Sequence, residues 1–144
     1  MFIRRLELND YNLGYLELLE SLTTVGNISY EEWSKRFLEI DINPDIQIWV
    51  IYCKDNNKIV GSSTILLEAK FIHSLGKVAH IEDVVINSQH RGEGLGKILI
   101  SHLIDIAKIN NCYKIILDCD GDNTQFYTKC GFTILGAQMG FYLQ

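Results

Sequence analysis

A chain of 144 residues is the size of one ordinary domain, and 47% of it is hydrophobic, which is enough for a packed core. The net charge of −5 argues against a duplex nucleic acid partner, because such binding depends on a basic face that neutralises phosphates. No run approaches the roughly eighteen apolar residues of a membrane-spanning helix, and the first residues lack the apolar core of a signal peptide. We expect a single cytoplasmic domain covering residues 1–144.

The cysteines show none of the Cys-x-x-Cys spacings that zinc sites use. They are Cys53, Cys112, Cys119 and Cys130. We expect no metal site, and we interpret these thiols as reduced and buried in a cytosolic protein.

The N-terminal third predicts one strand and two helices. A strand is expected at 2–8, and Asn9-Asp10 then starts a helix at 11–22 with leucines on one apolar face. Polar residues at 22–26 form a loop. Ser29 caps a second helix. The buried side of this second helix consists of Trp33, Phe37, Leu38 and Ile40.

The middle of the chain alternates between strands and turns. A strand is expected at 46–53, after the loop that contains Pro44, and a hairpin turn at 55–57 leads to a second strand at 58–68. Residues 70–73 connect to a third strand, which ends in the β-branched run at 84–86.

The C-terminal half begins with a helix, because apolar residues at 95, 98, 99, 103, 106 and 107 share one helical face. A strand at 112–120 follows, with the continuous apolar centre typical of a strand buried on both faces. A short helix at 122–130 and a last strand from 131 to about 143 complete the chain. The order β-α-α-β-β-β-α-β-α-β predicts an α/β fold with a mixed central sheet and helices on both faces.

A glycine loop separates the strand that ends at Ile86 from the following helix. Residues 91–96 read Arg-Gly-Glu-Gly-Leu-Gly. Glycine accepts positive φ and lets a ligand approach the backbone, and the first turn of a helix carries free amides at the positive end of its dipole. The loop therefore predicts a site for a diphosphate.

Spacing distinguishes three kinds of glycine loop. A Walker loop requires Ser or Thr after Gly-Lys, but Ile98 follows Lys97. A dinucleotide fingerprint requires Gly-x-Gly-x-x-Gly near the start of a βαβ unit, which this loop does not give. Arg91, Gly94 and Gly96 match the pattern Arg/Gln-x-x-Gly-x-Gly/Ala, and here the chain resembles the GNAT acyltransferases, whose loop binds the pyrophosphate of coenzyme A. A glycine-rich connection without a ligand is the remaining alternative.

Other segments narrow the resemblance to the amino-sugar branch of that family, the glucosamine-6-phosphate N-acetyltransferases, over nearly the whole chain. They are Leu-Thr-Thr-Val-Gly at 22–26, His-Ile-Glu-Asp-Val at 80–84, Cys-Tyr-Lys-Ile-Ile-Leu-Asp-Cys-Asp at 112–120, Asn123, Phe-Tyr at 126–127 and Lys-Cys-Gly-Phe at 129–132. The resemblance implies a GNAT fold and acetyl transfer from acetyl-CoA to the amine of glucosamine 6-phosphate, on the route to UDP-N-acetylglucosamine. It also implies direct attack without an acyl-enzyme, and a homodimer whose subunits share their final strands.

The resemblance assigns the coenzyme side of the site. The glycine loop would contact the pyrophosphate, and the strand at 82–84 would lie beside the pantetheine arm. Asn123 would bind that arm, cap the short helix, or do both. The cofactor-binding residues implied in this way are Glu82, Asp83, Val84, His90, Arg91, Gly92, Glu93, Gly94, Leu95, Gly96, Asn123 and Tyr127.

Three groups would carry the chemistry. The Val84 amide would donate to the thioester carbonyl, unless it is an ordinary ladder amide. The Tyr127 phenol would protonate the departing thiolate, unless it only packs as an aromatic ring. Asp118, expected inside a buried strand, would orient the amine and accept its proton, unless it forms a buried salt bridge. Glu82 and a chain of waters are rival bases.

The acceptor sugar would contact a separate set of residues, which match the family's substrate segments. They are Thr23, Lys70, Phe71, Ile72, His73, Leu103, Ile104, Asp118 and Tyr142. Tyr142 stands where the family has a basic side chain near the phosphate. Without the resemblance, Lys70 would be interpreted as a solvated charge and His73 as an incidental loop residue.

Two other functions stay open at the level of sequence. One is a GNAT enzyme that acetylates another amine, such as a polyamine, an aminoglycoside or a peptide N-terminus. The other is a coenzyme A-binding domain without turnover. The presence of both Asp118 and Tyr127 favours an enzyme.

Overall fold

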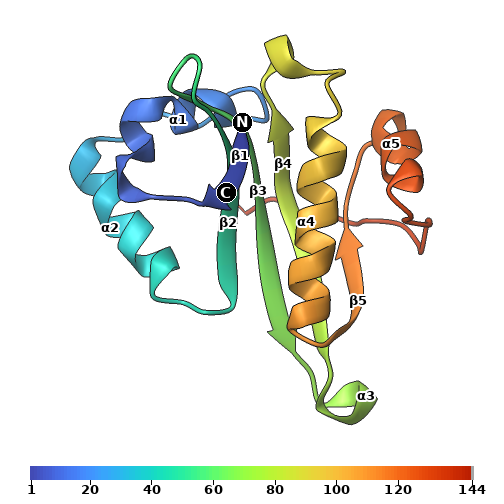
Figure 1. The fold of residues 1–144 in the computed structure, drawn as a ribbon. Helices are drawn as coiled ribbons and strands as arrows, with labels where there is room; N and C mark the ends of the chain where they lie inside the picture. Colours follow the sequence, from blue (N-terminus) through green and yellow to red (C-terminus); the bar gives the residue numbers. More distant parts are fainter. Residues whose placement is uncertain (144) are drawn as a thin grey trace.

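The computed structural model describes residues 1–143, which form a five-stranded sheet with helices on both faces (Figure 1). The strands are β1 (Phe2–Arg5), β2 (Ile46–Cys53), β3 (Lys58–Ala69), β4 (Lys77–Ile86) and β5 (Cys112–Leu117), and they lie in the sheet in this order. Neighbours from β1 to β4 pair antiparallel, whereas β4 and β5 run parallel. The predicted mixed α/β sheet is confirmed.

Helices cover the two faces of the sheet unequally. The α-helices are α1 (Tyr15–Leu19), α2 (Tyr30–Asp41), the short α3 (Ile72–Leu75), α4 (Leu95–Ile109) and α5 (Thr124–Lys129), and the 3-10 turns are η1 (Leu8–Leu13), η2 (Ser88–His90) and η3 (Gly121–Asn123). On one face α1 and α2 bury Tyr15 and Trp33 against Val50 of β2. On the other face α4 buries Leu103 against Ile65 of β3.

The N-terminal elements differ in extent from the prediction. A single helix at 11–22 is wrong, because Gly14 adopts a left-handed φ of 82° and divides the segment into η1 and α1. The first strand ends at Arg5 rather than at residue 8. There the chain turns into η1, whose buried Asp10 accepts bonds from the Arg4 guanidinium and from the Glu7 amide.

The cap of α2 is confirmed. The Ser29 hydroxyl accepts a bond from the Glu32 amide at 3.3 Å, and the Glu32 carboxylate accepts one from the Ser29 amide at 2.8 Å. This reciprocal pair satisfies amides that the first helical turn leaves free.

A bulge interrupts β4 near its end. In β3, Ser62 and Thr64 each have a partner in β4, whereas Ser63 faces two residues, Asp83 and Val84. Asp83 has a φ of 51°, a left-handed conformation that Asp adopts more readily than most residues. A bulge of this kind bends the strand and redirects its backbone groups.

The parallel strands β4 and β5 are joined at one end only. Their register runs from Lys77 opposite Cys112 to Ile81 opposite Leu117, and beyond that pair the two strands diverge (Figure 1). From residue 82 to 86, the β5-side edge of β4 therefore has no strand partner among residues 1–143. The predicted strand at 112–120, buried on both faces, is wrong: β5 ends at Leu117 and is half-exposed, because it is the last strand of the sheet.

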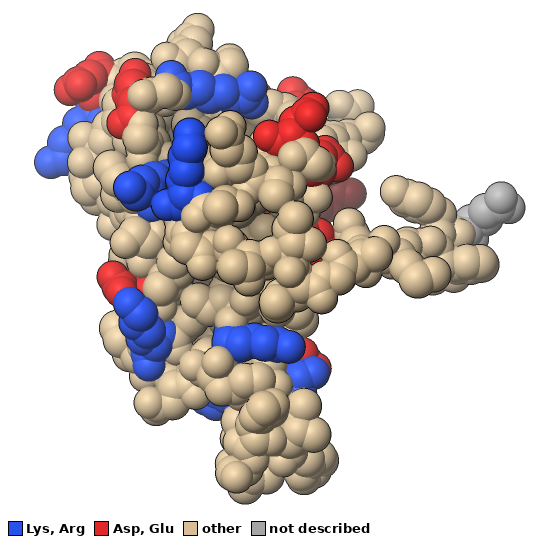
Figure 2. Space-filling view, turned by 90° about the vertical axis from the view of Figure 1, so that its right-hand side faces the viewer, with Lys and Arg blue, Asp and Glu red and all other residues tan. Residues whose placement is uncertain are grey.

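The expected last strand is also wrong for the single chain. Residues 132–143, which we call the C-terminal arm, contain no strand and are almost wholly exposed. A strand requires a partner backbone, and the arm stands away from the body of the molecule (Figure 2). The arm is uncharged and rich in apolar side chains: Ile134, Leu135, Met139, Phe141 and Leu143 are each at least 74% exposed.

Within residues 1–143 no helix is long and apolar enough to cross a membrane. The four cysteines are free thiols. Cys53 is buried as predicted, but Cys119 is exposed, because it follows β5 in a loop rather than lying inside a strand.

Candidate active site

The head of α4 presents unpaired main-chain donors. The amides from Gly92 to Lys97 donate to no carbonyl or side chain within residues 1–143. Gly94 precedes the helix with no side-chain cap, so the first turn opens directly onto the loop. Such amides, at the positive end of a helix of this length, suit an anion.

The glycines of this loop have distinct tasks. Gly92 and Gly94 adopt φ values of 84° and 79°, and a Cβ built on either would meet nothing within 4 Å. These two positions therefore need glycine for their backbone conformation, not for lack of space. A Cβ on Gly96 would lie 3.1 Å from the ring of Phe126, so Gly96 allows α5 to pack closely against α4.

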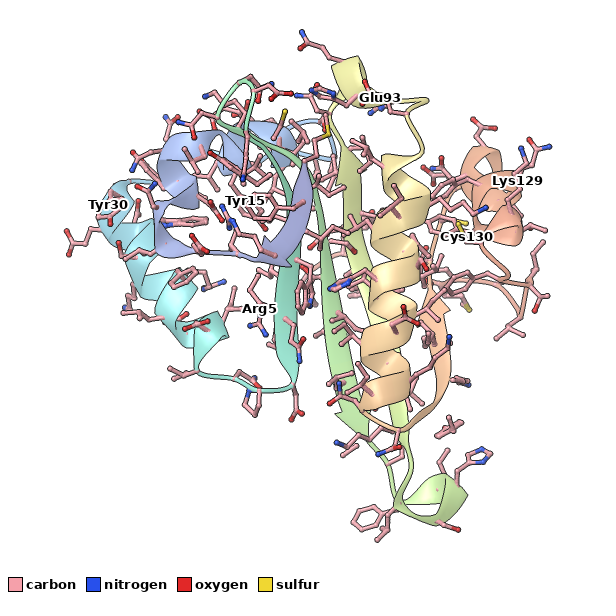
Figure 3. The ribbon with its side chains drawn as sticks, in the orientation of Figure 1. Arg5, Tyr15, Tyr30, Glu93, Lys129 and Cys130 are labelled. Atoms are coloured by element: carbon pink, nitrogen blue, oxygen red, sulfur yellow. The ribbon has the colours of Figure 1, made fainter. Side chains whose placement is uncertain are left out.

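Three polar side chains flank the loop. The Arg91 guanidinium is exposed, and its Nε donates to the Ile86 carbonyl oxygen at 3.3 Å. Its other N–H donors are left for a ligand. The His90 ring lies 3.3 Å from the Glu93 carboxylate, and Glu93 points outward from the loop above α4 (Figure 3). The predicted residues 90–96 are thus contiguous around one opening.

The free edge of β4 runs from residue 82 to 86 and contains the bulge. Val84 is half-buried against the α4 core, and its main chain belongs to the segment of β4 that β5 does not pair. Glu82, Asp83 and Val84 lie in this segment, as the sequence predicted. An extended ligand arm could add to this edge as a strand adds to a sheet, using alternate amides and carbonyls.

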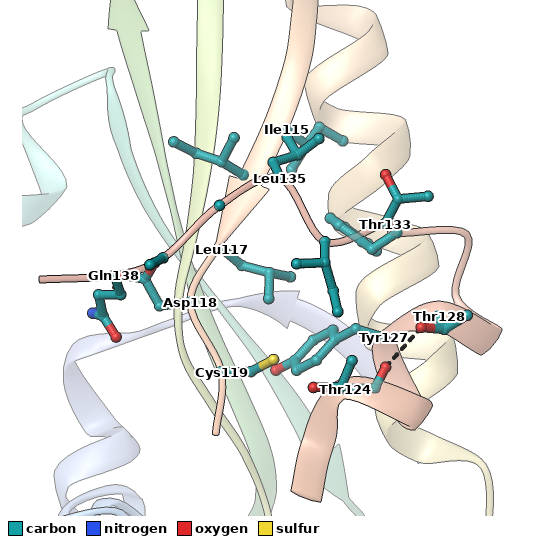
Figure 4. Close-up of a pocket in the computed structure, with 15 residues that line it drawn as sticks. Ile115, Leu117, Asp118, Cys119, Thr124, Tyr127, Thr128, Thr133, Leu135 and Gln138 are labelled. Atoms are coloured by element: carbon teal, nitrogen blue, oxygen red, sulfur yellow. Dashed lines mark hydrogen bonds between the residues drawn. The ribbon is translucent and has the colours of Figure 1, made fainter. Parts of the chain in front are cut away.

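A cavity of about 460 Å³ lies between β5, α5 and the C-terminal arm (Figure 4). Its walls are apolar at Ile115 and Leu117 and polar where Asp118, Cys119 and Tyr127 meet. Two of the three groups predicted to be catalytic, Asp118 and Tyr127, therefore line one cavity, which begins where β5 ends.

Tyr127 is held by aromatic neighbours. Its ring packs edge to face against Phe126 at 4.9 Å and Phe132 at 6.0 Å. Burial, and then the nearby thiols of Cys119 and Cys130, raise the pKa of Tyr127 to about 12. The phenol therefore keeps its proton at neutral pH and can donate it. It both packs and lines the cavity, so the two interpretations of this residue are compatible.

Asp118 is not buried inside a strand, contrary to the prediction. It follows the last residue of β5 and is exposed, because the strand ends one residue earlier. One of its oxygens accepts a bond of 2.8 Å from the Gln138 amide on the C-terminal arm. The alternative interpretation, a buried salt bridge, is wrong: Asp118 belongs to none of the ion pairs of residues 1–143, and its carboxylate is accessible.

Glu82 lies close enough to Asp118 for the two carboxylates to interact electrostatically. Burial raises the pKa of Glu82, and the charges of Asp118 and Asp83 raise it further. Two carboxylates in one place with different environments can divide the roles of proton acceptor and amine anchor. Glu82 therefore stays a rival base.

Asn123 precedes α5 and is exposed, and its side chain makes no capping bond to the described chain. Of the two sequence interpretations, the cap is wrong. Its side-chain amide is therefore free for another partner, next in sequence to Thr124, which lines the cavity.

Within one chain the predicted sugar contacts do not meet. Lys70, Phe71, Ile72 and His73 belong to the connection between β3 and β4, at the end of the molecule opposite the glycine loop (Figure 1). There Lys70 pairs with Glu68, and the His73 ring stacks on Tyr113 at 4.0 Å. We call residues 70–76 the β3–β4 tip.

Two other predicted contacts, Thr23 and Tyr142, are exposed but lie apart. Thr23 is in the loop between α1 and α2, and Tyr142 is 96% exposed on the C-terminal arm. Within one described chain, residues from the loop, the tip and the arm therefore do not form one site.

The prediction that Leu103 contacts the sugar is wrong. Leu103 has no exposed surface, because it lies on the side of α4 that packs on β3 and β4. Ile104, the next residue of α4, is half-buried against the same core and keeps some accessible surface.

Three residues near the site had no sequence signal. Ser63 is a plain strand serine, yet its hydroxyl donates to the Glu82 carbonyl at 3.0 Å. Cys119, predicted to be buried, is exposed and lines the cavity with Tyr127. Gln138, in the expected last strand, reaches Asp118. Only the fold brings these residues to the site.

Comparison with known proteins agrees with this geometry. Residues 11–132 match the model of the acetyltransferase (GNAT) family. The loop at the head of α4 and the divergence of β4 from β5 lie inside the matched region. The chain belongs to the GNAT acetyltransferase family.

Within that family the chain is similar to glucosamine 6-phosphate N-acetyltransferases. It is 43% identical to the Arabidopsis thaliana enzyme, over 97% of this chain and 95% of that enzyme. It is 39% identical to the Candida albicans enzyme, over 94% and 91%. The crystal structure of the Arabidopsis thaliana enzyme superposes with a TM-score of 0.96 at 42% identity, covering 99% of this chain and 98% of that chain.

Proposed function

We propose that this protein transfers the acetyl group of acetyl-CoA to the amine of glucosamine 6-phosphate and releases N-acetylglucosamine 6-phosphate. The observation that carries the proposal is the free amide run from Gly92 to Lys97 at the head of α4, next to a β4 edge that β5 leaves unpaired. Similarity to glucosamine 6-phosphate N-acetyltransferases at 35–43% identity over nearly the whole chain supports this acceptor over other amines.

The residues present fit acetyl-CoA as co-substrate. The amides of residues 92–97 and the Arg91 guanidinium would hold the pyrophosphate, where no side chain intrudes. The β4 edge from Glu82 to Val84 would pair with the amides of the pantetheine arm, and Asn123 would bind that arm from the other side. When bound, the thioester supplies an activated acyl group, and every other function belongs to the chain.

The chain's own groups then act in sequence. The Val84 amide donates to the thioester oxygen as charge develops on it, an interaction typically worth about 2.7–4 kcal/mol. Asp118 anchors the sugar's ammonium, and Asp118 or Glu82, directly or through water, takes a proton from it so that the amine can attack. The Tyr127 phenol donates its proton to the thiolate that leaves. No acyl-enzyme is formed.

We further propose that two copies form the working enzyme by exchanging their C-terminal arms. The arm presents apolar side chains to solvent, and Phe71 of the β3–β4 tip is 94% exposed. Apolar surface of this kind is typical of a buried interface. In such a dimer the tip and the arm of one subunit would reach the site of the other, bringing Lys70, His73 and Tyr142 to the sugar phosphate.

We also propose a cytoplasmic location. Four free thiols, one of them exposed, are typical of a reducing compartment.

The acceptor is tested by measuring release of free coenzyme A from acetyl-CoA against a panel of amines. We expect glucosamine 6-phosphate to be preferred over glucosamine, and both over spermidine, an aminoglycoside and a peptide amine. Equal rates across the panel would contradict the proposed acceptor. Tight binding of acetyl-CoA without turnover of any amine would instead indicate a non-catalytic coenzyme A-binding domain.

A further inference from the structure

We infer that Ser63 is a positioning residue: its hydroxyl fixes the bulge of β4 and thereby aims the Val84 amide at the acyl carbonyl. This inference rests on the proposed function, because it gives that amide a target. Ser63 is one of the few fully buried polar side chains of the molecule, with no exposed surface. Nothing in the sequence requires a hydroxyl at this place in β3.

The bulge leaves Ser63 in an unusual position. Its neighbours Ser62 and Thr64 have regular partners in β4, but Ser63 faces both Asp83 and Val84. An extra residue in one strand breaks the local ladder, so one backbone group of the bulge loses its partner. The Ser63 hydroxyl meets that need, because its Oγ donates to the Glu82 carbonyl oxygen at 3.0 Å.

This bond holds the peptide that precedes the bulge. Asp83 follows directly and adopts a φ of 51°, which a side chain larger than hydrogen does not favour. The Glu82 carbonyl and the Asp83 conformation together set the plane of the next peptide, and that peptide carries the Val84 amide. The donor's direction therefore depends on the anchor one residue earlier.

The hydroxyl has no other evident task. Its side of β3 packs under α4 with Trp49, its partner in β2, where an alanine methyl would be as well buried as a hydroxymethyl group. A serine kept for packing alone would place a polar atom in an apolar region without benefit. A serine kept for the bulge explains both its burial and its bond.

The chain offers a matched control one residue away. Ser62 is 1% exposed and sits on the opposite face of β3, where it lies beside the buried Tyr15 rather than at the bulge. Ser62→Ala and Ser63→Ala therefore remove equally buried hydroxyls from one strand. Only Ser63→Ala loosens the peptide before Val84.

The experiment compares two stable coenzyme A derivatives by calorimetry. One is the ketone analogue of acetyl-CoA, in which a methylene replaces the sulfur and the carbonyl is kept. The other is S-ethyl-coenzyme A, which has no acyl oxygen. The change of their Kd ratio between variants measures the carbonyl donor, because the other difference between the two ligands, a methylene in place of the sulfur, is the same for every variant. Thermal unfolding checks that each variant is folded.

In the unmodified chain we expect the ketone to bind more tightly than the ethyl thioether. In Ser63→Ala we expect this ratio to fall toward one, with the Kd of S-ethyl-coenzyme A unchanged and kcat lowered about tenfold. Ser62→Ala should keep the ratio and kcat. An unchanged ratio in Ser63→Ala, or an equal loss in Ser62→Ala, would overturn the inference while leaving the acetyltransferase proposal intact. No preference for the ketone in the unmodified chain would overturn the role of Val84, and this inference with it.

Discussion

The phenol of Tyr127 combines a fixed ring with a retained proton. Phe126 and Phe132 hold the ring on two sides, and burial raises its pKa to about 12. A donor that is rigid and still protonated at neutral pH is suited to meet a thiolate at the moment when it leaves.

We expect Tyr127→Phe to lower kcat about a hundredfold and to leave the Kd of coenzyme A within about twofold, because the ring is kept and only the proton donor is lost. Steady-state kinetics and calorimetry on the same preparations check this. Equal losses of turnover and of affinity would mean that the hydroxyl serves the structure of the pocket.

Glu82 and Asp118 can be separated by pH. The pKa of Glu82 is raised by burial and then by Asp118, so Glu82 takes up its proton at a higher pH than an ordinary glutamate does. If Glu82 is the base, kcat/KM falls as the pH drops through this raised pKa. Asp118→Asn removes one cause of the shift and should move that acid limb to lower pH.

Profiles of kcat/KM against pH for the unmodified chain, Asp118→Asn and Glu82→Gln decide between the carboxylates. We expect Glu82→Gln to abolish the acid limb and to lower the plateau. A limb that survives in Glu82→Gln and disappears in Asp118→Asn would assign the base to Asp118 instead.

Leu103 belongs to the core and not to the sugar site. Leu103→Ala should lower the free energy of unfolding by about 3 kcal/mol, since it removes a fully buried side chain from between α4 and the sheet. The KM for glucosamine 6-phosphate should stay unchanged in the folded fraction. Ile98→Ala, on the exposed side of the same helix, is the control and should change stability little. Urea unfolding measures the stability of both variants. A raised KM for glucosamine 6-phosphate in Leu103→Ala but not in Ile98→Ala would show that Leu103 belongs to the sugar site.

At the scale of elements, α4 matters for its first turn. The loop before it supplies amides, and its glycines keep side chains out of the opening. Gly94→Glu places a carboxylate beside the proposed pyrophosphate site, in open space but with a strained φ of 79°. We expect the Kd of coenzyme A to rise more than a hundredfold in a protein that still folds, because like charges repel and the amides are screened.

Gly131→Glu is the matched control for this variant. Gly131 has a φ of 96° and equally open surroundings, but it follows α5 rather than preceding α4. It should lose a similar amount of stability and keep its affinity for coenzyme A. If both variants bound coenzyme A equally well, the head of α4 would not be the pyrophosphate site.

Elements with a strong repeating pattern could be predicted from sequence, and elements that depend on distant partners could not. The apolar face of α4, the hairpin of β2 and β3 and the Ser29 cap are local signals, and each is confirmed, except that Ile98 is exposed rather than part of the buried face. The break at Gly14 was missed because a single glycine is tolerated inside many helices. The last strand was overestimated because residues 132–143 carry the apolar content of a strand but find no partner backbone in their own chain.

The same division applies to the site. The glycine loop is a local motif, and its residues lie together as expected. Asp118 was expected to be buried because its apolar neighbours suggested a longer β5, and no local pattern fixes where a strand leaves the sheet. The role of Ser63 depends on a register shift between two strands, which a single sequence does not record.

At the scale of the whole molecule, the tip and the arm predict a dimer. Light scattering coupled to gel filtration should give twice the chain mass of 16.5 kDa. A chain that ends at residue 131 should be monomeric and inactive, because it lacks the arm. A monomeric full-length chain with full activity would contradict the exchange of arms.

Mixing two inactive dimers tests whether the sites are shared. Tyr127→Phe removes the proton donor from the cavity of its own chain. In the proposed dimer, Lys70→Ala instead removes a contact to the sugar phosphate from the site of the partner chain. In a mixed dimer one of the two sites would keep both residues intact. Co-expression should therefore restore about a quarter of the unmodified activity for random pairing. If Tyr127 and Lys70 of one site came from the same chain, co-expression would restore no activity.

The divergence of β4 from β5 also bears on how long the folded protein lasts. Where the fourth and fifth strands diverge, the sheet lacks several of the bonds that a closed sheet would have, and in the proposed function the acyl carrier would supply the missing partners. A ligand that binds only the native state shifts the folding equilibrium by mass action, so the free energy of unfolding of the enzyme is highest when acetyl-CoA is abundant. At low acetyl-CoA the unpaired segment of β4 would be more accessible to proteases, so the amount of enzyme in a cell would follow the concentration of its co-substrate.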